Sequence, residues 1–218
     1  MKQVKIKHLG LNIIGPNYGF LLTKVPQEVL NELKPPVEKL KNNFSLGKPW
    51  NQGLAGEIEH EYELPIPSRI VEDYIKNIGA ELDEGIGYLN NNYEKITRIY
   101  CSSLWVNFQK KYEYNPIHYH NGAFSFVIWY QIPYTFEEES KYSYKRNGEN
   151  SNHGTFNFVT PNLSSKISNI TCTTLDSDKR IEGYVAIFPS TLNHIVYPFY
   201  SSDDYRITVA GNIMVKTG

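Results

Sequence analysis

Three of the chain's six histidines stand in a pattern that constrains both its fold and its chemistry. His118 and His120 are two residues apart in a strand-like segment, and His194 stands in a second strand-like segment. Side chains two apart on a strand project from one face, so both rings can reach one metal ion. The gap of 74 residues (194 minus 120) is unlike a zinc finger and natural for a jelly roll, whose neighbouring strands are far apart in sequence. The pattern therefore predicts a three-histidine metal site in a jelly roll.

From about Thr97 onward, the sequence is rich in β-branched and aromatic residues, separated by turn-forming clusters. We expect strands at residues 99–108, 123–132, 155–159, 184–188 and 206–215. Two polar stretches, 137–154 and 162–182, are expected to be loops near the mouth of the site. Helical signals come first and strands follow, which indicates a mainly β chain with N-terminal helices that buttress it. We therefore predict a double-stranded β-helix, that is, a jelly roll with helices on its outer face.

The N-terminal third of the chain combines strand and helix signals. Residues 1–23 are expected to form one or two short strands, with a turn at 15–17. A short helix is predicted from Pro26, and the pair Pro35-Pro36 is expected to break or restart it. A longer helix is predicted from Ser68, its N-cap, to about Leu82. Its apolar stripe is expected to pack on a sheet and consists of Ile70, Val71, Tyr74, Ile75, Ile78 and Leu82.

Length and charge limit the class of protein. The 218 residues suit one domain, with 1–94 as strand and helical support and 95–218 as the jelly-roll core with the metal site. With 22 basic and 23 acidic residues the net charge is −1, which offers no basic surface for nucleic acid. The chain begins without the apolar core of a signal peptide, and no run approaches the roughly 18 apolar residues of a spanning helix. We expect a cytoplasmic protein, in the host cytoplasm if it is phage-encoded, with no nucleic-acid or membrane partner.

An anion site is predicted next to the metal site. Arg206 follows His194 by 12 residues (206 minus 194), and Thr208 lies two residues farther along, so both side chains face the same way on a strand. A planar guanidinium binds a carboxylate with two parallel hydrogen bonds, and the threonine hydroxyl can share that carboxylate. The pair therefore suits a dicarboxylate co-substrate.

The metal site departs from the usual mononuclear iron site in one ligand. Such sites take two histidines and one carboxylate on one face of the metal. In the common spacing an Asp or Glu would stand at position 120, where this chain has His120. A third imidazole completes the set of three but leaves the complex one unit more positive, which should shift its redox potential.

These residues resemble the 2-oxoglutarate and Fe(II)-dependent oxygenases, especially the oxygenases common in bacteria and their phages and those similar to prolyl hydroxylases. The resemblance covers roughly residues 95–215. The segments that carry it are Trp105-Val106-Asn107, Pro116-Ile117-His118-Tyr119-His120, Ser125-Phe126-Val127-Ile128-Trp129-Tyr130, Phe188-Pro189-Ser190, His194 and Arg206-Ile207-Thr208-Val209-Ala210-Gly211-Asn212.

The resemblance implies a ligand set and a reaction. His118, His120 and His194 would hold Fe(II), and Arg206 with Thr208 would hold the far carboxylate of 2-oxoglutarate. The reaction would couple oxidative decarboxylation of 2-oxoglutarate to succinate with hydroxylation of a substrate C–H bond. The expected substrate is a small molecule or a peptide side chain such as proline, and a homodimer is left open.

Other residues are weaker candidates. Asn107 and Tyr130 flank the ligands and could hydrogen-bond 2-oxoglutarate, although Tyr130 could equally be a core aromatic. His60 lies in an acidic stretch that we expect to be a solvated face, with a substrate contact as the alternative. Three large aromatic residues are expected in the core: Trp105, Phe126 and Trp129.

Two other functions stay open at the level of the sequence. A three-histidine metal dioxygenase would oxidise a small molecule without 2-oxoglutarate, and Arg206 would then bind the substrate's own carboxylate. A non-enzymatic β-sandwich, a viral or bacterial binding module, would hold zinc or no metal in the same histidines. Succinate production distinguishes the first alternative, and metal content after anaerobic purification distinguishes the second.

Overall fold

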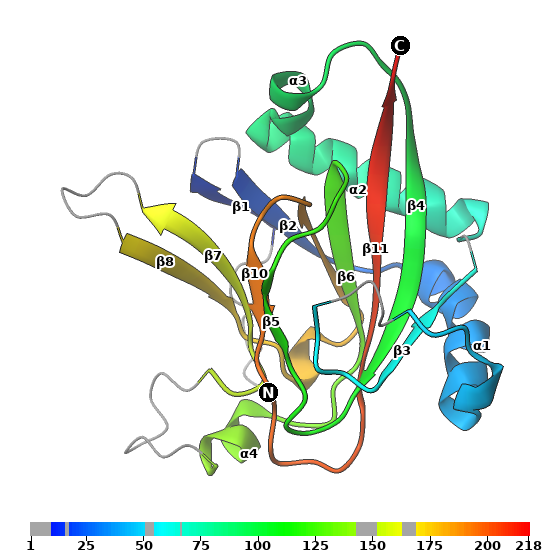
Figure 1. Ribbon diagram of the computed structural model, residues 1–218, viewed down its shortest axis with the longest axis vertical. Coiled ribbons are helices and arrows are strands. Elements are labelled where there is room, and N and C mark those ends of the chain that lie inside the picture. Colours follow the sequence, from blue (N-terminus) through cyan, green and yellow to red (C-terminus); the bar gives the residue numbers. More distant parts are fainter. Residues whose placement is uncertain (1–9, 16–17, 51–54, 66, 143–151, 163–168) are drawn as a thin grey trace.

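The computed structural model describes residues 10–15, 18–50, 55–65, 67–142, 152–162 and 169–218. Within these ranges the chain forms two antiparallel sheets (Figure 1). The strands are β1 (Gly10–Gly15), β2 (Tyr18–Lys24), β3 (His60–Glu63), β4 (Ile96–Gln109), β5 (Asn115–His118), β6 (Phe124–Gln131), β7 (Phe156–Asn162), β8 (Asn169–Leu175), β9 (Tyr184–Pro189), β10 (His194–Val196) and β11 (Arg206–Thr217). The helices are α1 (Gln27–Asn42), α2 (Arg69–Ile86), α3 (Tyr88–Asn92) and α4 (Phe136–Ser140), with short 3-10 turns η1 (Phe44–Leu46) and η4 (Lys179–Ile181).

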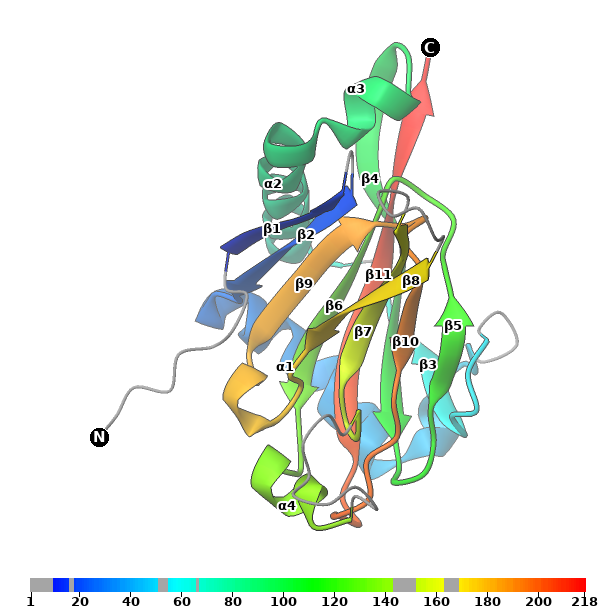
Figure 2. The ribbon, with the colours of Figure 1, turned by 90° about the vertical axis from the view of Figure 1, so that its left-hand side faces the viewer.

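The two sheets face each other as the layers of a jelly roll (Figure 2). The larger sheet has the order β1-β2-β9-β6-β11-β4-β3, and the smaller has the order β5-β10-β7-β8. Neighbouring strands such as β2 and β9, or β6 and β11, are far apart in sequence, as this architecture requires. The predicted double-stranded β-helix is confirmed. The strands of residues 1–94 belong to the same sheet as the later strands, because β2 pairs with β9 and β3 pairs with β4.

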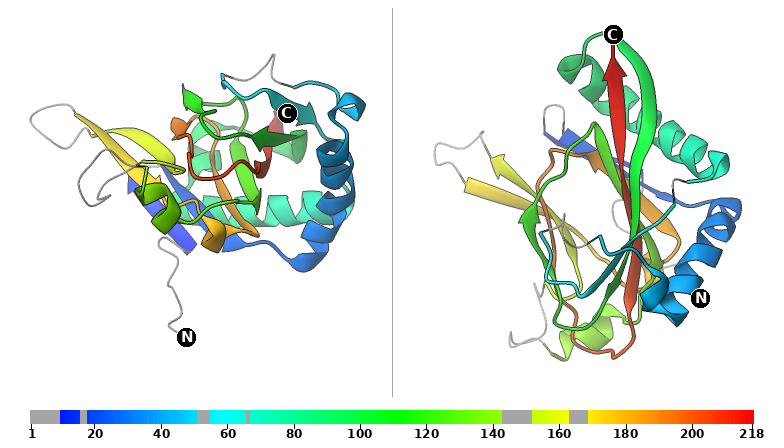
Figure 3. Two further views of the ribbon diagram at one scale, coloured as in Figure 1. Left: turned by 90° about the horizontal axis from the view of Figure 1, so that it is seen from below. Right: turned by 45° about the vertical axis from the view of Figure 1, so that its right-hand side comes forward.

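The longer helices cover the outer face of the larger sheet (Figure 3). As predicted, α2 follows Ser68, whose side chain accepts a hydrogen bond from the backbone N–H of Val71. The helix continues past Leu82 and ends at Gly87, which adopts the left-handed conformation (φ 64°) that favours glycine. Most of the predicted stripe is buried, but Ile70 is 48% exposed and does not belong to it.

Helix α1 differs from the sequence prediction. It runs without interruption through Pro35 and Pro36, where a break or restart was expected. Each proline removes one N–H from the hydrogen-bond ladder of the helix. The helix persists because its apolar face continues across both prolines, and packing supplies most of the stability of a helix in a protein. The buried residues of this face are Val29, Leu33, Val37 and Leu40.

The five predicted strands are present as β4, β6, β7, β9 and β11, whereas the two predicted loops are partly wrong. The stretch 162–182 contains β8, which pairs with β7 along its whole length. Its threonines and Ile170 favour an extended chain even though the stretch is polar. The stretch 137–154 contains most of α4, which begins with a capping box between Thr135 and Glu138. Residues 1–9 and 16–17 of the predicted N-terminal strands and turn, and residues 143–151 and 163–168 of the two predicted loops, lie outside the described residues.

An aromatic core fills the space between the sheets. Its largest members come from both layers and include Phe20, Trp129, Phe156, Phe158 and Phe188. Phe158 stacks on Phe20 across the layers, with ring centroids 4.8 Å apart. None of the helices in the described residues has the length and apolar character needed to cross a membrane.

Candidate metal centre

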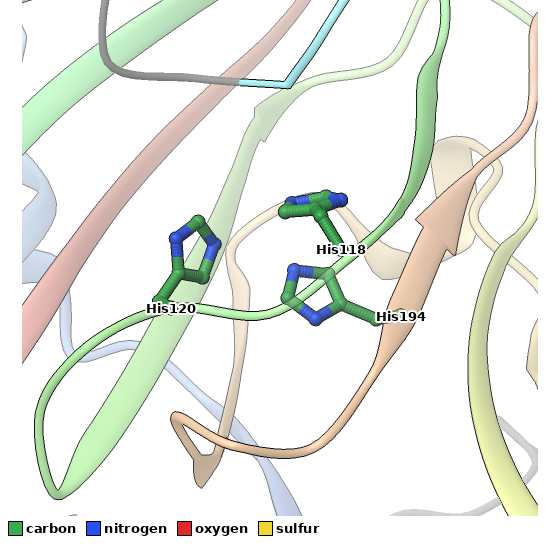
Figure 4. Close-up of side chains that lie close together, drawn as sticks. All are labelled: His118, His120 and His194. Atoms are coloured by element: carbon green, nitrogen blue, oxygen red, sulfur yellow. The ribbon is translucent and has the colours of Figure 1, made fainter.

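Three imidazoles converge between the sheets (Figure 4). His118 ends β5, His194 begins β10, and these two residues are direct partners in the antiparallel ladder. The ring centroids of His118 and His194 are 4.2 Å apart, and the ring of His120 lies 5.0 Å from the first and 5.1 Å from the second. One ligand nitrogen from each ring lies within 4.8 Å of the others. This spacing allows one ion to be held after small side-chain rotations, since metal–nitrogen bonds are about 2.0–2.1 Å long.

His120 reaches this position from a connection rather than from a strand. The sequence placed His118 and His120 on one strand, but β5 ends at His118. The backbone N–H of His120 donates a hydrogen bond of 2.8 Å to the carbonyl of Ser190 at the end of β9. The chain therefore turns from the smaller toward the larger sheet at this residue, and its ring still faces the other two.

Backbone carbonyls fix which nitrogen of two rings is available for metal. Nδ1 of His118 lies 2.7 Å from the carbonyl oxygen of Pro116, and Nδ1 of His194 lies 3.0 Å from that of Leu192. A carbonyl oxygen only accepts, so Nδ1 carries the proton in both rings. Nε2 then keeps its lone pair, which is the arrangement that orients histidine ligands in metal sites.

Burial keeps the three rings neutral. It lowers the pKa of His194 well below its ordinary value, and the neighbouring rings lower it further. Burial also lowers the pKa of His118, and burial with the nearby His118 ring lowers the pKa of His120 to about 4. Neutral imidazole is the form that coordinates a metal ion, so the cluster is ready to bind one at neutral pH.

Aromatic side chains surround the cluster. Phe156 stacks on His194 with ring centroids 5.3 Å apart, and Phe188 packs edge-on against the same ring at 5.0 Å. Trp105 lies 5.7 Å from the ring of His120. These residues and Trp129 line a cavity in front of the histidines. The side chains packed directly on the rings are therefore aromatic, while polar side chains such as Asn107, Gln109 and Thr208 line the rest of the cavity.

Arg206 lines the same cavity, but all of its donors are engaged within the chain. Its Nε and one terminal nitrogen both donate to Oε1 of Gln109, at 3.0 and 2.6 Å. The other N–H groups donate to the hydroxyl of Tyr134 and to the carbonyl oxygens of Gly154 and Tyr197. The side chain is 2% exposed. Five N–H donors thus have five hydrogen bonds, and one edge of the guanidinium is closed by Gln109.

Thr208 and Asn107 line the same cavity as Arg206. They are register partners on β11 and β4, and Nδ2 of Asn107 donates to Oγ1 of Thr208 at 3.1 Å. Because the hydroxyl accepts this bond, its own hydrogen is free to point into the cavity. Among the described residues, Oδ1 of Asn107 has no hydrogen-bond partner.

Other predicted site residues lie elsewhere. Tyr130 donates its hydroxyl hydrogen to Glu38 of α1 at 3.0 Å, so it faces the helix layer, and this placement does not support the predicted contact with 2-oxoglutarate. His60 stacks on Phe44 with ring centroids 4.1 Å apart, so it is a packed residue rather than part of a solvated face. The predicted core positions of the three large aromatics are confirmed: Trp105, Phe126 and Trp129 are all buried.

Two residues were not singled out from the sequence: Gln109, which lines the cavity, and Glu61, which lies next to the lining residue Asn107. Gln109 closes the edge of Arg206, and its position two residues after Asn107 on a strand was a usable signal, since the two side chains share a face. Glu61 is 1% exposed, although it lies in a strongly acidic stretch. The acidic stretch was expected to be a solvated face, with a substrate contact only as the alternative, so Glu61 was not singled out.

Comparisons with known proteins agree with this geometry. A family model described as "Putative 2OG-Fe(II) oxygenase" matches residues 103–212, half of the chain. The crystal structure of a Pseudomonas putida prolyl-4-hydroxylase is similar with a TM-score of 0.53 and 11% identity, covering 91% of this chain and 94% of that one. At this identity the similarity shows the shared fold alone, and no curated protein matches the sequence. The chain belongs to the 2OG-Fe(II) oxygenase family, whose cofactors are Fe(II) and 2-oxoglutarate.

Proposed function

We propose that this protein is a hydroxylase in which His118, His120 and His194 hold Fe(II), while Arg206 and Thr208 hold the far carboxylate of 2-oxoglutarate. One observation carries the proposal: the three neutral imidazoles and the arginine–threonine pair line the same cavity. Bound iron would supply the oxidising chemistry: one atom of dioxygen would oxidise 2-oxoglutarate to succinate with loss of carbon dioxide, and the other would hydroxylate a C–H bond of the substrate. The protein would supply binding and orientation.

Arg206 can receive a carboxylate only after Gln109 has moved. Oε1 of Gln109 accepts from the same edge of the guanidinium, Nε and a terminal nitrogen, that a carboxylate would take with two parallel bonds. We propose that the co-substrate replaces Gln109 on this edge. Tyr134, Gly154 and Tyr197 keep the remaining donors occupied and hold the guanidinium plane in place. The free hydroxyl hydrogen of Thr208 would complete the carboxylate site.

We place a peptide side chain first among the substrates. The similar Pseudomonas putida protein is a prolyl-4-hydroxylase, and its fold extends over nearly the whole of this chain. This similarity of fold is what supports the choice.

A three-histidine dioxygenase that does not use 2-oxoglutarate is the second candidate. Two observations favour it. No carboxylate belongs to the ligand cluster found in the described part of the chain, and Arg206 is already satisfied by internal acceptors. In that case Arg206 would be a structural residue or would bind a carboxylate of the substrate.

The first experiment measures co-substrate binding and succinate formation. Protein purified without oxygen and loaded with Fe(II) is titrated with 2-oxoglutarate by calorimetry, then exposed to oxygen, and succinate is quantified. We expect binding that depends on the metal and a slow release of succinate. Metal binding without any succinate would reject the proposal and favour the second candidate.

Arg206→Lys tests the carboxylate site. A lysine offers a point charge in place of a planar fork, so we expect the affinity for 2-oxoglutarate to fall at least tenfold while metal affinity changes less than about twofold. Arg98→Lys, at an exposed position on β4, is the matched control. Because the change leaves buried acceptors unpaired, thermal unfolding must confirm that the variant is folded. Equal affinity in a folded variant would remove Arg206 from the site.

A further inference from the structure

Glu61 is a buried carboxylate without a donor. The described residues contain three acidic side chains that are almost completely buried: Glu61, Glu139 and Asp178. Glu139 accepts from the backbone N–H groups of Tyr200 and Ser201 and from the Ser201 hydroxyl. Asp178 accepts from two backbone N–H groups and from Arg180. Neither oxygen of Glu61 has a partner in the described structure, although burying an unpaired charge costs several kcal/mol.

The position of Glu61 places it beside the cavity. On the edge strand β3 it is the direct register partner of Asn107 on β4, and partners across a ladder project from the same face about 4.5–5.5 Å apart. Asn107 lines the cavity, is 8% exposed and has its own Oδ1 without a donor. Two neighbouring side chains therefore present three acceptor oxygens and no matching donor.

Protonation of Glu61 does not satisfy this group. Burial, together with the like charge of Glu113, raises the pKa of Glu61 to about 7, so the neutral acid is accessible. A neutral carboxyl supplies one O–H donor, which can serve one acceptor such as Oδ1 of Asn107 and leaves the carbonyl oxygen of Glu61 unpaired.

The cations near β3 are engaged elsewhere. Lys48 pairs with Glu63, and Lys110 pairs with Glu59. The nearby Glu113 adds further negative charge, which acts on Glu61. The surroundings of Glu61 are therefore acidic, and they favour a ligand that carries positive charge.

We propose that Glu61 and Asn107 bind a cationic N–H group of the substrate, a guanidinium or an ammonium, at the cavity wall beside the metal centre. Such a group carries several donors and forms charge-assisted hydrogen bonds with a carboxylate. The proposal rests on the proposed function in that the ligand is taken to be the substrate of the hydroxylase. It assigns the substrate to the class of basic side chains, such as arginine or lysine in a peptide.

The test compares probes of matched shape and different charge. Acetyl-arginine amide, acetyl-lysine amide, neutral acetyl-citrulline amide and acetyl-proline amide are titrated into Fe(II)-loaded protein with 2-oxoglutarate in the absence of oxygen. We expect at least one of the two cations to bind tenfold or more tightly than citrulline and proline. Neither cation binding more tightly than citrulline would overturn the proposal, and this comparison needs no variant.

Glu61→Gln then assigns the effect to the residue. The substitution keeps the shape and removes the charge, so we expect the preference for the cation to fall at least tenfold. Glu63→Gln removes a charge from the same strand at the surface and should leave the preference unchanged. An unchanged preference in a folded Glu61→Gln protein would also overturn the proposal. Succinate formation measured on the same preparations separates the two ideas, because succinate without a preference for cations rejects this inference alone.

Discussion

Arg206 and Glu61 are both buried beside the cavity, but their hydrogen-bonding capacity is satisfied to opposite degrees. Every N–H of Arg206 has an acceptor in the chain, whereas no oxygen of Glu61 has a donor in the described residues. A satisfied arginine is held rigidly, and a ligand must exchange with one of its partners. An unsatisfied carboxylate instead carries a cost that a ligand can remove.

Gln109→Glu tests the exchange at Arg206. The new carboxylate would pair with the guanidinium through charge-assisted bonds, which are roughly twice as strong as neutral ones, and it would repel an incoming carboxylate. We expect the affinity for 2-oxoglutarate, measured by calorimetry, to fall at least tenfold with metal affinity nearly unchanged. Gln109→Ala opens the same edge of the guanidinium and should bind 2-oxoglutarate at least as tightly as the parent protein. If both variants bind like the parent, the co-substrate does not use this edge.

The raised pKa of Glu61 makes a pH-dependent contribution to stability. Burial first, and then Glu113, raise it from 4.5 to about 7, so the folded state holds the proton more tightly than the unfolded state. The resulting stabilisation is complete below pH 4.5 and is lost as pH rises through 7. Glu61→Gln has no such loss, so its stability relative to the parent should rise by about 2–3 kcal/mol between pH 5 and pH 8.

Urea unfolding at the two pH values measures this difference. Glu63→Gln, whose carboxylate faces Lys48 at the surface, controls for the loss of a charge from β3. A gap between Glu61→Gln and the parent that stays the same at pH 5 and pH 8 would show that the Glu61 carboxyl is not destabilised by burial.

At the scale of elements, α2 is the helix that the sequence predicted best, and its two faces offer a matched pair of substitutions. Leu82 is completely buried against the sheet, whereas Ile70 on the same helix is 48% exposed. We expect Leu82→Ala to lower the free energy of unfolding by about 2–5 kcal/mol and Ile70→Ala by less than about 1 kcal/mol. Chemical denaturation of both variants checks this, and equal losses would place Ile70 in the core.

Periodicity predicted the elements whose burial follows one regular face. It gave α2, whose apolar residues recur at helical spacing. The five principal strands were predicted instead from β-branched and aromatic composition between turn-forming clusters, and the jelly roll from the spacing of the histidines. The sequence misjudged α1, which continues through the proline pair because its apolar face is packed. It also misjudged β8, which is a strand despite its polar composition because it pairs with β7. Local sequence cannot contain these effects, since the partners are remote along the chain.

The candidate site, like the fold, was predicted only in part from the sequence. The three histidines were found because a two-residue spacing and a remote partner agree with one fold. Gln109 and Glu61 were not found, because their importance comes from cross-strand neighbours, Arg206 and Asn107, that are set by sheet register. For Tyr130 the sequence left two positions open, the cavity and the core, and its hydrogen bond to Glu38 with its packing on the core favours the second.

For the whole molecule, the histidine cluster joins the two layers of the jelly roll. His118 and His194 belong to the smaller sheet, while His120 stands in the connection that leads to β6 of the larger sheet. A bound ion would link these segments only in the folded state, since the ligands are far apart in an unfolded chain. Metal binding must then stabilise the fold by mass action.

We predict that a divalent metal ion at a hundredfold excess over its dissociation constant stabilises the protein by about 2.7 kcal/mol. For a domain of this size, that corresponds to a rise in Tm of about 5–10 °C, which anaerobic thermal unfolding with Fe(II) can measure. His120→Ala removes one ligand and should lose most of this rise. His60→Ala, which removes a histidine packed on Phe44 away from the cluster, should retain it even if its Tm without metal is lower. The same rise in the His120→Ala protein would mean that the ion binds elsewhere and that the three histidines do not form its site.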